Sequence, residues 1–191
     1  MTVANHQAIQ KLIEEEGIFE NYDIQNVGPA SYELRIGSAL SISNDIEYPI
    51  GVGEEFVLRE TSHTLIGTME KIKMPKYLVG TMFLKSRYGR GGFLPWGQGL
   101  VDPGYEGNLT ISLLNLSQHP KIFVGGDKIC HITFQYLETE TDKPYDGVYK
   151  GSEGATGPKE KPPMKVLGDT FNAVVTGMAS GIAQGAVTGG S

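Results

Sequence analysis

Between Ser31 and Leu137 the sequence is divided into short runs of apolar and β-branched residues, separated by Gly, Pro, Asn and Asp. Turn-forming residues at this close spacing are typical of strands joined by tight turns. We therefore expect an all-β fold, a barrel or a sandwich with one or two small helices. The expected strands are Ser31–Ile36, Leu40–Ile42, Glu55–Leu58, Thr64–Lys73, Leu78–Leu84, Asn108–Leu114, Lys121–Val124 and Lys128–Leu137.

A single short helix is expected before these strands. Apolar residues at positions 8, 9, 12 and 13 fall on one face of a helix that runs from His6 to Glu16. Asn5 can cap its first turn, and Gly17 can end it. We therefore predict a β domain that follows a short amphipathic helix.

The composition is ordinary for a globular protein, with 39% hydrophobic and 20% charged residues among 191. Lys and Arg number 16 against 22 Asp and Glu, a net charge of −6 that argues against a nucleic acid polymer as partner. Cys130 is the only cysteine and lies in an apolar run, so we expect a buried structural thiol. The sequence shows neither a signal peptide, nor a membrane span, nor metal-ligand spacing, and we expect a cytoplasmic protein without structural zinc.

The stretch Phe83–Asn115 concentrates glycine and cationic side chains. Lys85, Ser86, Arg87 and Arg90 place three permanent charges and one hydroxyl within six residues, among glycines that let backbone amides approach a ligand closely. Guanidinium, ammonium and hydroxyl groups are donors that bind phosphate oxygens. The pattern indicates an anion site.

Asp102 is the acidic residue of this stretch that is most suited to chemistry. It stands between two glycine-rich turns and before the strand Asn108–Leu114. A carboxylate at the tip of a hairpin beside a bound phosphate can orient a water molecule or bind a sugar hydroxyl. Phe93 and Trp96 are expected to be packing residues, and His63 is expected in a solvated loop without a function.

The composition changes after residue 137. From Glu138 onward the chain is rich in Gly, Pro, Lys and acidic residues, which predicts a mobile arm rather than core. Phe171–Ser191 carries no charge and has glycine at every fourth position from 177 to 189, so it is either a flexible tail or a peptide that docks on a partner, an assembly or a membrane surface. The expected division is a β domain over 1–150, a mobile arm over 151–170 and the tail over 171–191.

Several blocks of the sequence resemble, in order and in spacing, the trimeric dUTPase and dCTP deaminase superfamily, and most closely its archaeal-type dUTPases built on the deaminase-like chain. The resemblance runs from about Gly28 to Gly151. It implies a distorted, jelly-roll-like β-barrel that assembles as a homotrimer, in which neighbouring subunits complete each site. The blocks are GPASYELRIG, LKSRYGRGG, GQGLVDPGYEGNLTISLLN, GDKICHITF and PYDGVYKG.

The resemblance implies a role for each residue on the nucleoside side of the site. Asp102 would orient the attacking water or hold the sugar 3′-hydroxyl. Tyr105 would lie against the deoxyribose and leave no room for a 2′-hydroxyl. Main-chain groups of Gly107, Asn108 and Leu109 would read the edge of the pyrimidine.

On the phosphate side, the resemblance implies that Lys85, Ser86 and Arg90 grip the triphosphate. Glu33 would help to place Mg²⁺ through a water molecule, and the ion would arrive with the nucleotide and keep several waters. The implied substrate contacts also include Arg87, His131 and Tyr149.

Several positions depart from the family pattern. Ser112 stands where the deaminases carry the Glu that moves protons on the cytosine ring, and a hydroxyl has neither the charge nor the pKa for that task. Deamination of cytosine is therefore disfavoured. Arg87 replaces a serine of the phosphate block, and it could add a phosphate contact or block the site with its bulk. Glu33 replaces an Asp, and His131 replaces a Gln.

Three functions follow from the resemblance. The leading one is hydrolysis of dUTP to dUMP and diphosphate with Mg²⁺, and the sequence around Asp102 favours it. The second is a dUTPase-fold trimer with weak or absent catalysis that serves as a binding or assembly module, which Arg87, His131 and the C-terminal tail favour. The third is an enzyme that hydrolyses dCTP or a modified pyrimidine deoxynucleotide.

Overall fold

The computed structural model describes residues 2–41, 46–97 and 99–159. Residues 1–157 form one compact unit. The predicted tail 171–191 and the part of the predicted arm from residue 160 to 170 lie outside the described residues.

The N-terminal helix α1 spans His6–Glu14. The side chain of Asn5 accepts a hydrogen bond from the backbone N–H of Ala8 at 3.0 Å, which confirms the predicted cap. The apolar face of α1 is buried, and its residues are Ile9, Leu12 and Ile13. Two shorter helical segments follow, the 3₁₀ turn η1 (Ile24–Asn26) and α2 (Ser86–Arg90). No helix within the described ranges is long and apolar enough to cross a membrane.

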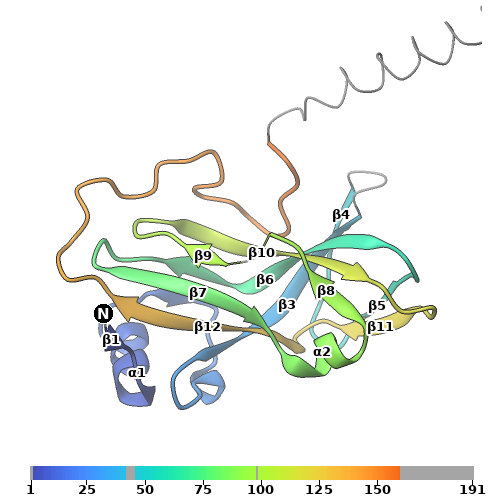
Figure 1. Ribbon diagram of the computed structural model, residues 1–191, viewed down its shortest axis with the longest axis horizontal. Coiled ribbons are helices and arrows are strands. Elements are labelled where there is room, and N and C mark those ends of the chain that lie inside the picture. The colour runs from blue at the N-terminus through green and yellow to red at the C-terminus, as the bar shows by residue number, and fades with distance from the viewer. Residues whose placement is uncertain (1, 42–45, 98, 160–191) are drawn as a thin grey trace, which may run out of the picture. The chain divides into compact units, whose positions relative to one another are not determined.

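Antiparallel strands make up most of the remaining structure, as the sequence predicts (Figure 1). One curled sheet follows the order β8-β10-β6-β3-β12-β7-β9, with β1 added to β12, β2 to β6 and β4 to β3. A second, two-stranded sheet pairs β11 with β5. The strands are β1 (Thr2–Val3), β2 (Phe19–Glu20), β3 (Tyr32–Ser41), β4 (Ile46–Pro49), β5 (Glu55–Leu58), β6 (His63–Lys73), β7 (Leu78–Leu84), β8 (Phe93–Pro95), β9 (Leu100–Val101), β10 (Glu106–Asn115), β11 (Lys121–Val124) and β12 (Lys128–Tyr136).

The core follows the alternation of the strands. On β3, Leu34 and Ile36 are fully buried, whereas Glu33 and Arg35 are half-buried on the other face, as predicted. Phe93 is buried, but Trp96 is 65% exposed, and its predicted packing role is wrong. Trp96 follows the last residue of β8, so the strand no longer directs its side chain into the core.

The segment of residues 151–157, which we call the strap, packs against β10, β6 and β3 instead of extending as an arm. Its Gly151 N–H donates to the carbonyl oxygen of Glu106 at 2.7 Å, and its Ser152 carbonyl accepts from the N–H of Asn108 at 2.9 Å. Ser152 and Ala155 are buried. Composition misses this packing because backbone groups make most of these contacts.

Replacing Gly67 by alanine is expected to release the strap. A Cβ at residue 67 would lie 2.5 Å from the carbonyl carbon of Gly154 and closer still to the Ala155 nitrogen. Because β6 is paired on both sides, the strap must move rather than the strand. We expect trypsin to cleave after Lys150 at least about tenfold faster, since several backbone hydrogen bonds are lost.

Limited proteolysis with mass spectrometry measures this rate. Gly99→Ala is the matched control, because a Cβ at Gly99 meets no atom within 4 Å. Equal cleavage rates in Gly67→Ala and the wild-type protein would contradict the predicted release.

Candidate functional site

Asp102 lies in the turn that joins β9 to β10, and the backbone around it is fixed. The N–H of Gly104 donates to the carbonyl of Met74 at 3.0 Å, and the N–H of Met74 donates to the carbonyl of Tyr105 at 2.8 Å. The carboxylate of Asp102 is half-buried and makes no hydrogen bond or ion pair with any residue that the structure describes. A rigid turn thus presents an uncommitted carboxylate.

Tyr105 is locked beside this turn. Its hydroxyl donates to the carbonyl oxygen of Asn108 at 2.6 Å, and its ring meets that of Tyr145 edge-on with centroids 5.5 Å apart. Burial, with the neighbouring Tyr145, raises the pKa of Tyr105 to about 12, so the phenol stays protonated at neutral pH. The Tyr105 ring is therefore uncharged and fixed in position beside the turn.

The main-chain groups that were predicted to read the pyrimidine already have partners in the chain. The N–H of Asn108 donates to Ser152 in the strap, and the N–H of Leu109 donates to Oγ1 of Thr68 at 3.0 Å. The Gly107 backbone has φ +132°, and a Cβ there would lie 2.7 Å from the Ser152 carbonyl oxygen. The hairpin and the strap therefore form one hydrogen-bonded unit in this conformation.

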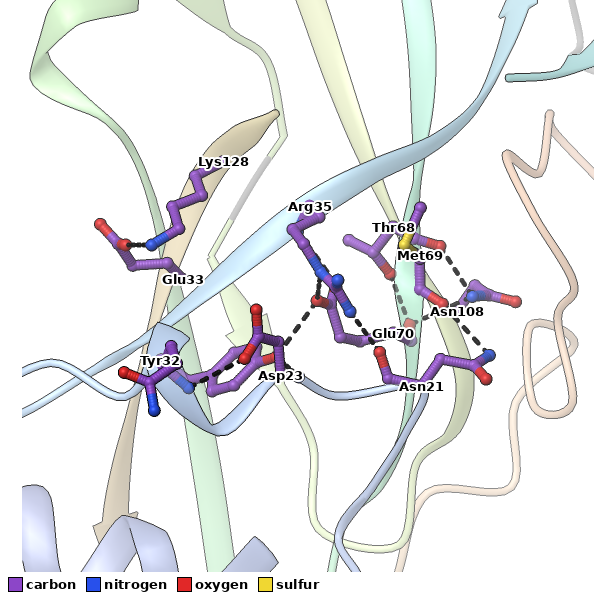
Figure 2. Close-up of polar contacts among 11 residues, drawn as sticks. Asn21, Asp23, Tyr32, Glu33, Arg35, Thr68, Met69, Glu70, Asn108 and Lys128 are labelled. Atoms are coloured by element: carbon purple, nitrogen blue, oxygen red, sulfur yellow. Dashed lines mark hydrogen bonds and ion pairs between the residues drawn. The ribbon is translucent and has the colours of Figure 1, made fainter. Parts of the chain in front are cut away.

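A buried ion pair lies behind the hairpin, and Figure 2 shows it between β3 and β6. The side chain of Glu70 has no exposed surface, and its carboxylate accepts from Arg35 Nε at 2.7 Å, from the Arg35 N–H at 2.9 Å and from the Tyr32 hydroxyl at 3.2 Å. The side-chain amide of Asn108 donates to the carbonyls of Thr68 and Glu70, at 2.8 and 3.1 Å. This network fixes the strand against which the hairpin is held.

Sequence reasoning missed Glu70, although a signal was present. In the expected strand Thr64–Lys73, a period of two places Glu70 on the same face as Ile66 and Ile72, both fully buried. An acidic residue at a core position requires a buried partner. The pattern therefore predicts a cationic partner for Glu70, and in the structure this partner is Arg35.

The cationic residues lie at the other end of β7. Lys85 and Ser86 line an open groove of about 480 Å³, together with Phe83, Pro95 and Gly99. The side chains of Ser86 and Arg90 are exposed on α2. Of the predicted phosphate-binding residues, Lys85 and Ser86 therefore share one groove, and Arg90 ends the short helix that Ser86 begins.

Arg87 turns away from this groove. Its guanidinium carbon lies 4.7 Å from the centroid of the Tyr88 ring, and its Nη2 donates to the Tyr88 hydroxyl at 2.7 Å. The same nitrogen donates to the Lys128 carbonyl at 3.2 Å and lies 3.4 Å from a carboxylate oxygen of Asp127. In this arrangement Arg87 neither blocks the groove nor points into it.

Glu33 lies between two lysines. Lys85 Nζ pairs with its Oε1, and Lys128 Nζ lies 2.7 Å from its Oε2, a pair drawn in Figure 2. Burial raises the pKa of the Glu33 carboxyl, but hydrogen bonds and charges of Lys128 and Lys85 outweigh it and lower the pKa from 4.5 to about 2. The carboxylate is therefore ionised throughout the physiological range.

These contacts do not fit the predicted role of Glu33 in placing Mg²⁺. Both carboxylate oxygens already accept from ammonium groups, and those two charges oppose a nearby dication. Across the described ranges, no three His, Cys, Asp or Glu side chains gather into a metal-binding group.

The ion pairs of Glu33 are expected to make part of the folding stability acid-sensitive. Because the folded pKa is about 2 and the ordinary value is 4.5, this contribution is complete above pH 4.5 and is lost as the pH falls toward 2. Urea unfolding of wild type and Glu33→Gln measures it. We expect the stability advantage of wild type to be constant from pH 7 to 5 and to shrink between pH 4.5 and 2. An advantage that persists unchanged at pH 2 would contradict this assignment.

Within one chain, Asp102 lies far from the cationic residues of the groove. Val101 pairs with Gly80 on β7, and Lys85 lies beyond the far end of that strand. Five residues of extended chain, from 80 to 85, span roughly 16 Å. Figure 1 shows the β9–β10 turn and α2 at opposite ends of the sheet.

His131 and Tyr149, the two remaining residues of the predicted site, lie outside the groove that Lys85 lines. His131 on β12 stands opposite Glu33, and burial followed by the charge of Lys85 lowers its pKa. Tyr149 is 37% exposed, and its N–H lies 3.4 Å from the hydroxyl of Tyr145. Neither residue lines the groove beside Lys85.

The structure tests the predictions for His63 and Cys130. His63 is not in a loop: it begins β6, and its Nε2 lies 2.6 Å from the hydroxyl of Ser112 on β10. The prediction was wrong because the turn residues before His63 suggested a longer loop.

Cys130 is fully buried, as predicted, and burial raises the pKa of its thiol to about 12. Because the thiolate is the reactive form, such a thiol is not a nucleophile at neutral pH.

Comparison with known proteins shows the family of this chain. Residues 3–137 match the family model described as dCTP deaminase-like. A dCTP deaminase of Thermococcus sibiricus is 34% identical over 146 residues, which cover 74% of this chain and 89% of the relative. A dUMP-forming dCTP deaminase of Persephonella marina is 29% identical over 170 residues, which cover 81% and 94% of the two chains.

Among solved structures, the 2′-deoxycytidine 5′-triphosphate deaminase from Agrobacterium tumefaciens has the same fold, with a TM-score of 0.60 at 19% identity. The superposition covers 70% of this chain and 47% of that one. Family model, sequence relatives and fold agree with the resemblance of the sequence blocks to this superfamily, and the named sequence relatives are dCTP deaminases rather than dUTPases. The chain therefore belongs to the dCTP deaminase-like family, within the dUTPase and dCTP deaminase superfamily.

Proposed function

We propose that the protein hydrolyses a pyrimidine 2′-deoxynucleoside triphosphate to the monophosphate and diphosphate, with dUTP as the expected substrate. The observation that carries the proposal is the uncommitted carboxylate of Asp102 on a rigid turn, next to the locked ring of Tyr105. A catalytic carboxylate must be able to accept a proton from water, and an ion-paired one would be less basic.

In the proposed reaction, a water oxygen attacks the α-phosphorus and the bond from that phosphorus to the bridging oxygen of the β-phosphate breaks. Asp102 orients the water and accepts its proton, and diphosphate leaves with the released electron pair. Lys85, Ser86 and Arg90 stabilise the charge that develops on the phosphate oxygens. Mg²⁺ would enter as part of the nucleotide complex and so belongs to the substrate.

We also propose that the active form is a homotrimer. The separation of Asp102 from Lys85 within one chain supports this, because one subunit presents only half of each site. A second subunit would supply the cationic half. Sedimentation of the full chain as a monomer would contradict this assembly.

Deamination is the reaction of the named relatives, but Ser112 argues against it here. A serine hydroxyl bonded to His63 cannot replace the ionisable carboxylate that moves protons on the cytosine ring. Burial lowers the pKa of His63, and an imidazole carries no negative charge that could replace the carboxylate.

A second candidate keeps hydrolysis but changes the base, to dCTP or a modified pyrimidine deoxynucleotide. The relatives favour it, because those that match over most of the chain are named dCTP deaminases and two of them are named dUMP-forming. The third candidate, a binding module without catalysis, is favoured by the strap, which occupies main-chain groups of the hairpin.

The test measures diphosphate and ammonia released from dUTP, dCTP, dTTP and UTP, each with Mg²⁺. We expect diphosphate from dUTP, little from UTP because of Tyr105, and no ammonia. Diphosphate from dCTP alone would establish the second candidate. Absence of diphosphate from all four nucleotides would reject the enzyme, and calorimetric nucleotide binding would then support the binding module. Ammonia from dCTP would overturn the argument from Ser112.

A further inference from the structure

Glu33 holds two ammonium groups that come from distant parts of the sequence. Lys85 follows β7 and Lys128 begins β12, while Glu33 lies between them on β3. Each lysine takes a different oxygen of the carboxylate. The side chain of Glu33 is 21% exposed and that of Lys85 20%, so the three groups are partly shielded from solvent.

The two lysines keep donors for a ligand. An ammonium group has three N–H donors, and each lysine uses one on Glu33. The structure records no other acceptor for either ammonium group among the residues it describes. Lys85 lines the 480 Å³ groove, and the side chain of Lys128 is 40% exposed. The free donors are therefore accessible to an anion.

The charge of this surface is opposite to that of the chain. The whole chain has a net charge of −6. At Glu33 two ammonium groups meet one carboxylate, a local surplus of positive charge that attracts a polyanion.

We propose that Lys128 is a further binding residue for the triphosphate and that Glu33 is a positioning residue that holds Lys128 beside Lys85, the lysine that lines the groove. This inference rests on the proposed function and deepens it. Arg87 contributes indirectly, since its bond to the Lys128 carbonyl fixes the backbone that carries this lysine. The carboxylate of Glu33 repels a phosphate. It strengthens phosphate binding only if holding the two lysines in place contributes more than this repulsion costs.

The experiment titrates inorganic triphosphate into the full-length protein by calorimetry, which requires no hydrolysis. Lys128→Gln is expected to weaken binding about tenfold, because it removes charge-assisted hydrogen bonds. Lys76→Gln is the matched control, since Lys76 is exposed before the opposite end of β7, and its affinity should stay within about twofold of wild type. Unchanged binding by Lys128→Gln would overturn the assignment of Lys128.

The role of Glu33 is tested by whether its neutralisation strengthens or weakens triphosphate binding. A neighbour that merely repels the anion would give tighter binding when it is neutralised, whereas a positioning residue gives weaker binding. We expect Glu33→Gln to weaken triphosphate binding about fivefold or more and Glu33→Asp to recover most of the loss. Tighter binding by Glu33→Gln would reject the positioning role. Triphosphate results that follow these expectations in a protein that hydrolyses no nucleotide would uphold this inference while rejecting the proposed function.

Discussion

Asp102→Asn is expected to reduce the rate of diphosphate release by about 100-fold to 10,000-fold, the usual contribution of a positioned general base. Asparagine preserves the size of the side chain but cannot accept a proton from water. The turn should persist, because it is held by backbone hydrogen bonds of Gly104 and Met74 rather than by the carboxylate. The expected loss is therefore in kcat, with nucleotide affinity changed little.

Steady-state assays with dUTP, supported by calorimetric nucleotide binding, separate these two quantities. Asp142→Asn is the matched control, because Asp142 is an exposed acid outside both the Asp102 turn and the groove. A rate within tenfold of wild type for Asp102→Asn would remove this residue from the chemistry. A rise in KM at unchanged kcat would assign it to holding the sugar instead.

The fold was predictable where turn residues bound an apolar run on both sides. Glu55–Leu58, Leu78–Leu84 and Lys121–Val124 are strands with the predicted limits. The two-residue strands Thr2–Val3 and Leu100–Val101 were not predicted, because they are strands only by pairing with β12 and β7. Such pairings depend on distant partners, which local pattern does not contain.

The sequence motifs name candidate residues but not their arrangement. Asp102, Tyr105 and Lys85 stay predictions, and the motifs did not reveal that one chain separates Asp102 from Lys85. Likewise, Glu33 and Lys128 are 95 positions apart in sequence, from 33 to 128, and meet only because β3 pairs with β12. Contacts across a sheet arise from register, so roles that depend on them require the structure.

The strap shows a third limit. Its sequence, GSEGATG, contains no large apolar residue and predicts no packing. It is nevertheless held by backbone donors, including the Ala155 N–H to Oγ of Ser38 at 2.7 Å and the Gly154 N–H to the Asn108 side chain at 3.1 Å. A glycine is needed opposite the strap, because a Cβ at residue 67 would meet the strap backbone. Contacts made by backbone groups cannot be predicted from hydrophobicity.

Glu70→Gln is expected to lower the free energy of unfolding by about 3 to 5 kcal/mol, the typical effect of removing one partner from a buried ion pair. The amide keeps one acceptor but cannot serve Arg35 Nε, the Arg35 N–H and the Tyr32 hydroxyl together, and its NH₂ would face donors. Urea unfolding at neutral pH measures the loss. The hairpin should loosen with it, since Asn108 binds the carbonyl of Glu70.

Two further variants separate the ion pair from general damage to the core. Glu153→Gln breaks the exposed pair with Lys71 and should change stability little, because solvent screens it. The double variant Arg35→Met with Glu70→Met should lose less stability than the two single losses together, because no unpaired charge remains buried. Additive losses, or a loss below about 1 kcal/mol for Glu70→Gln, would mean that Arg35 and Glu70 do not act as a pair. The strand that supports the nucleoside hairpin would then owe its position to apolar packing around Ile66 and Ile72.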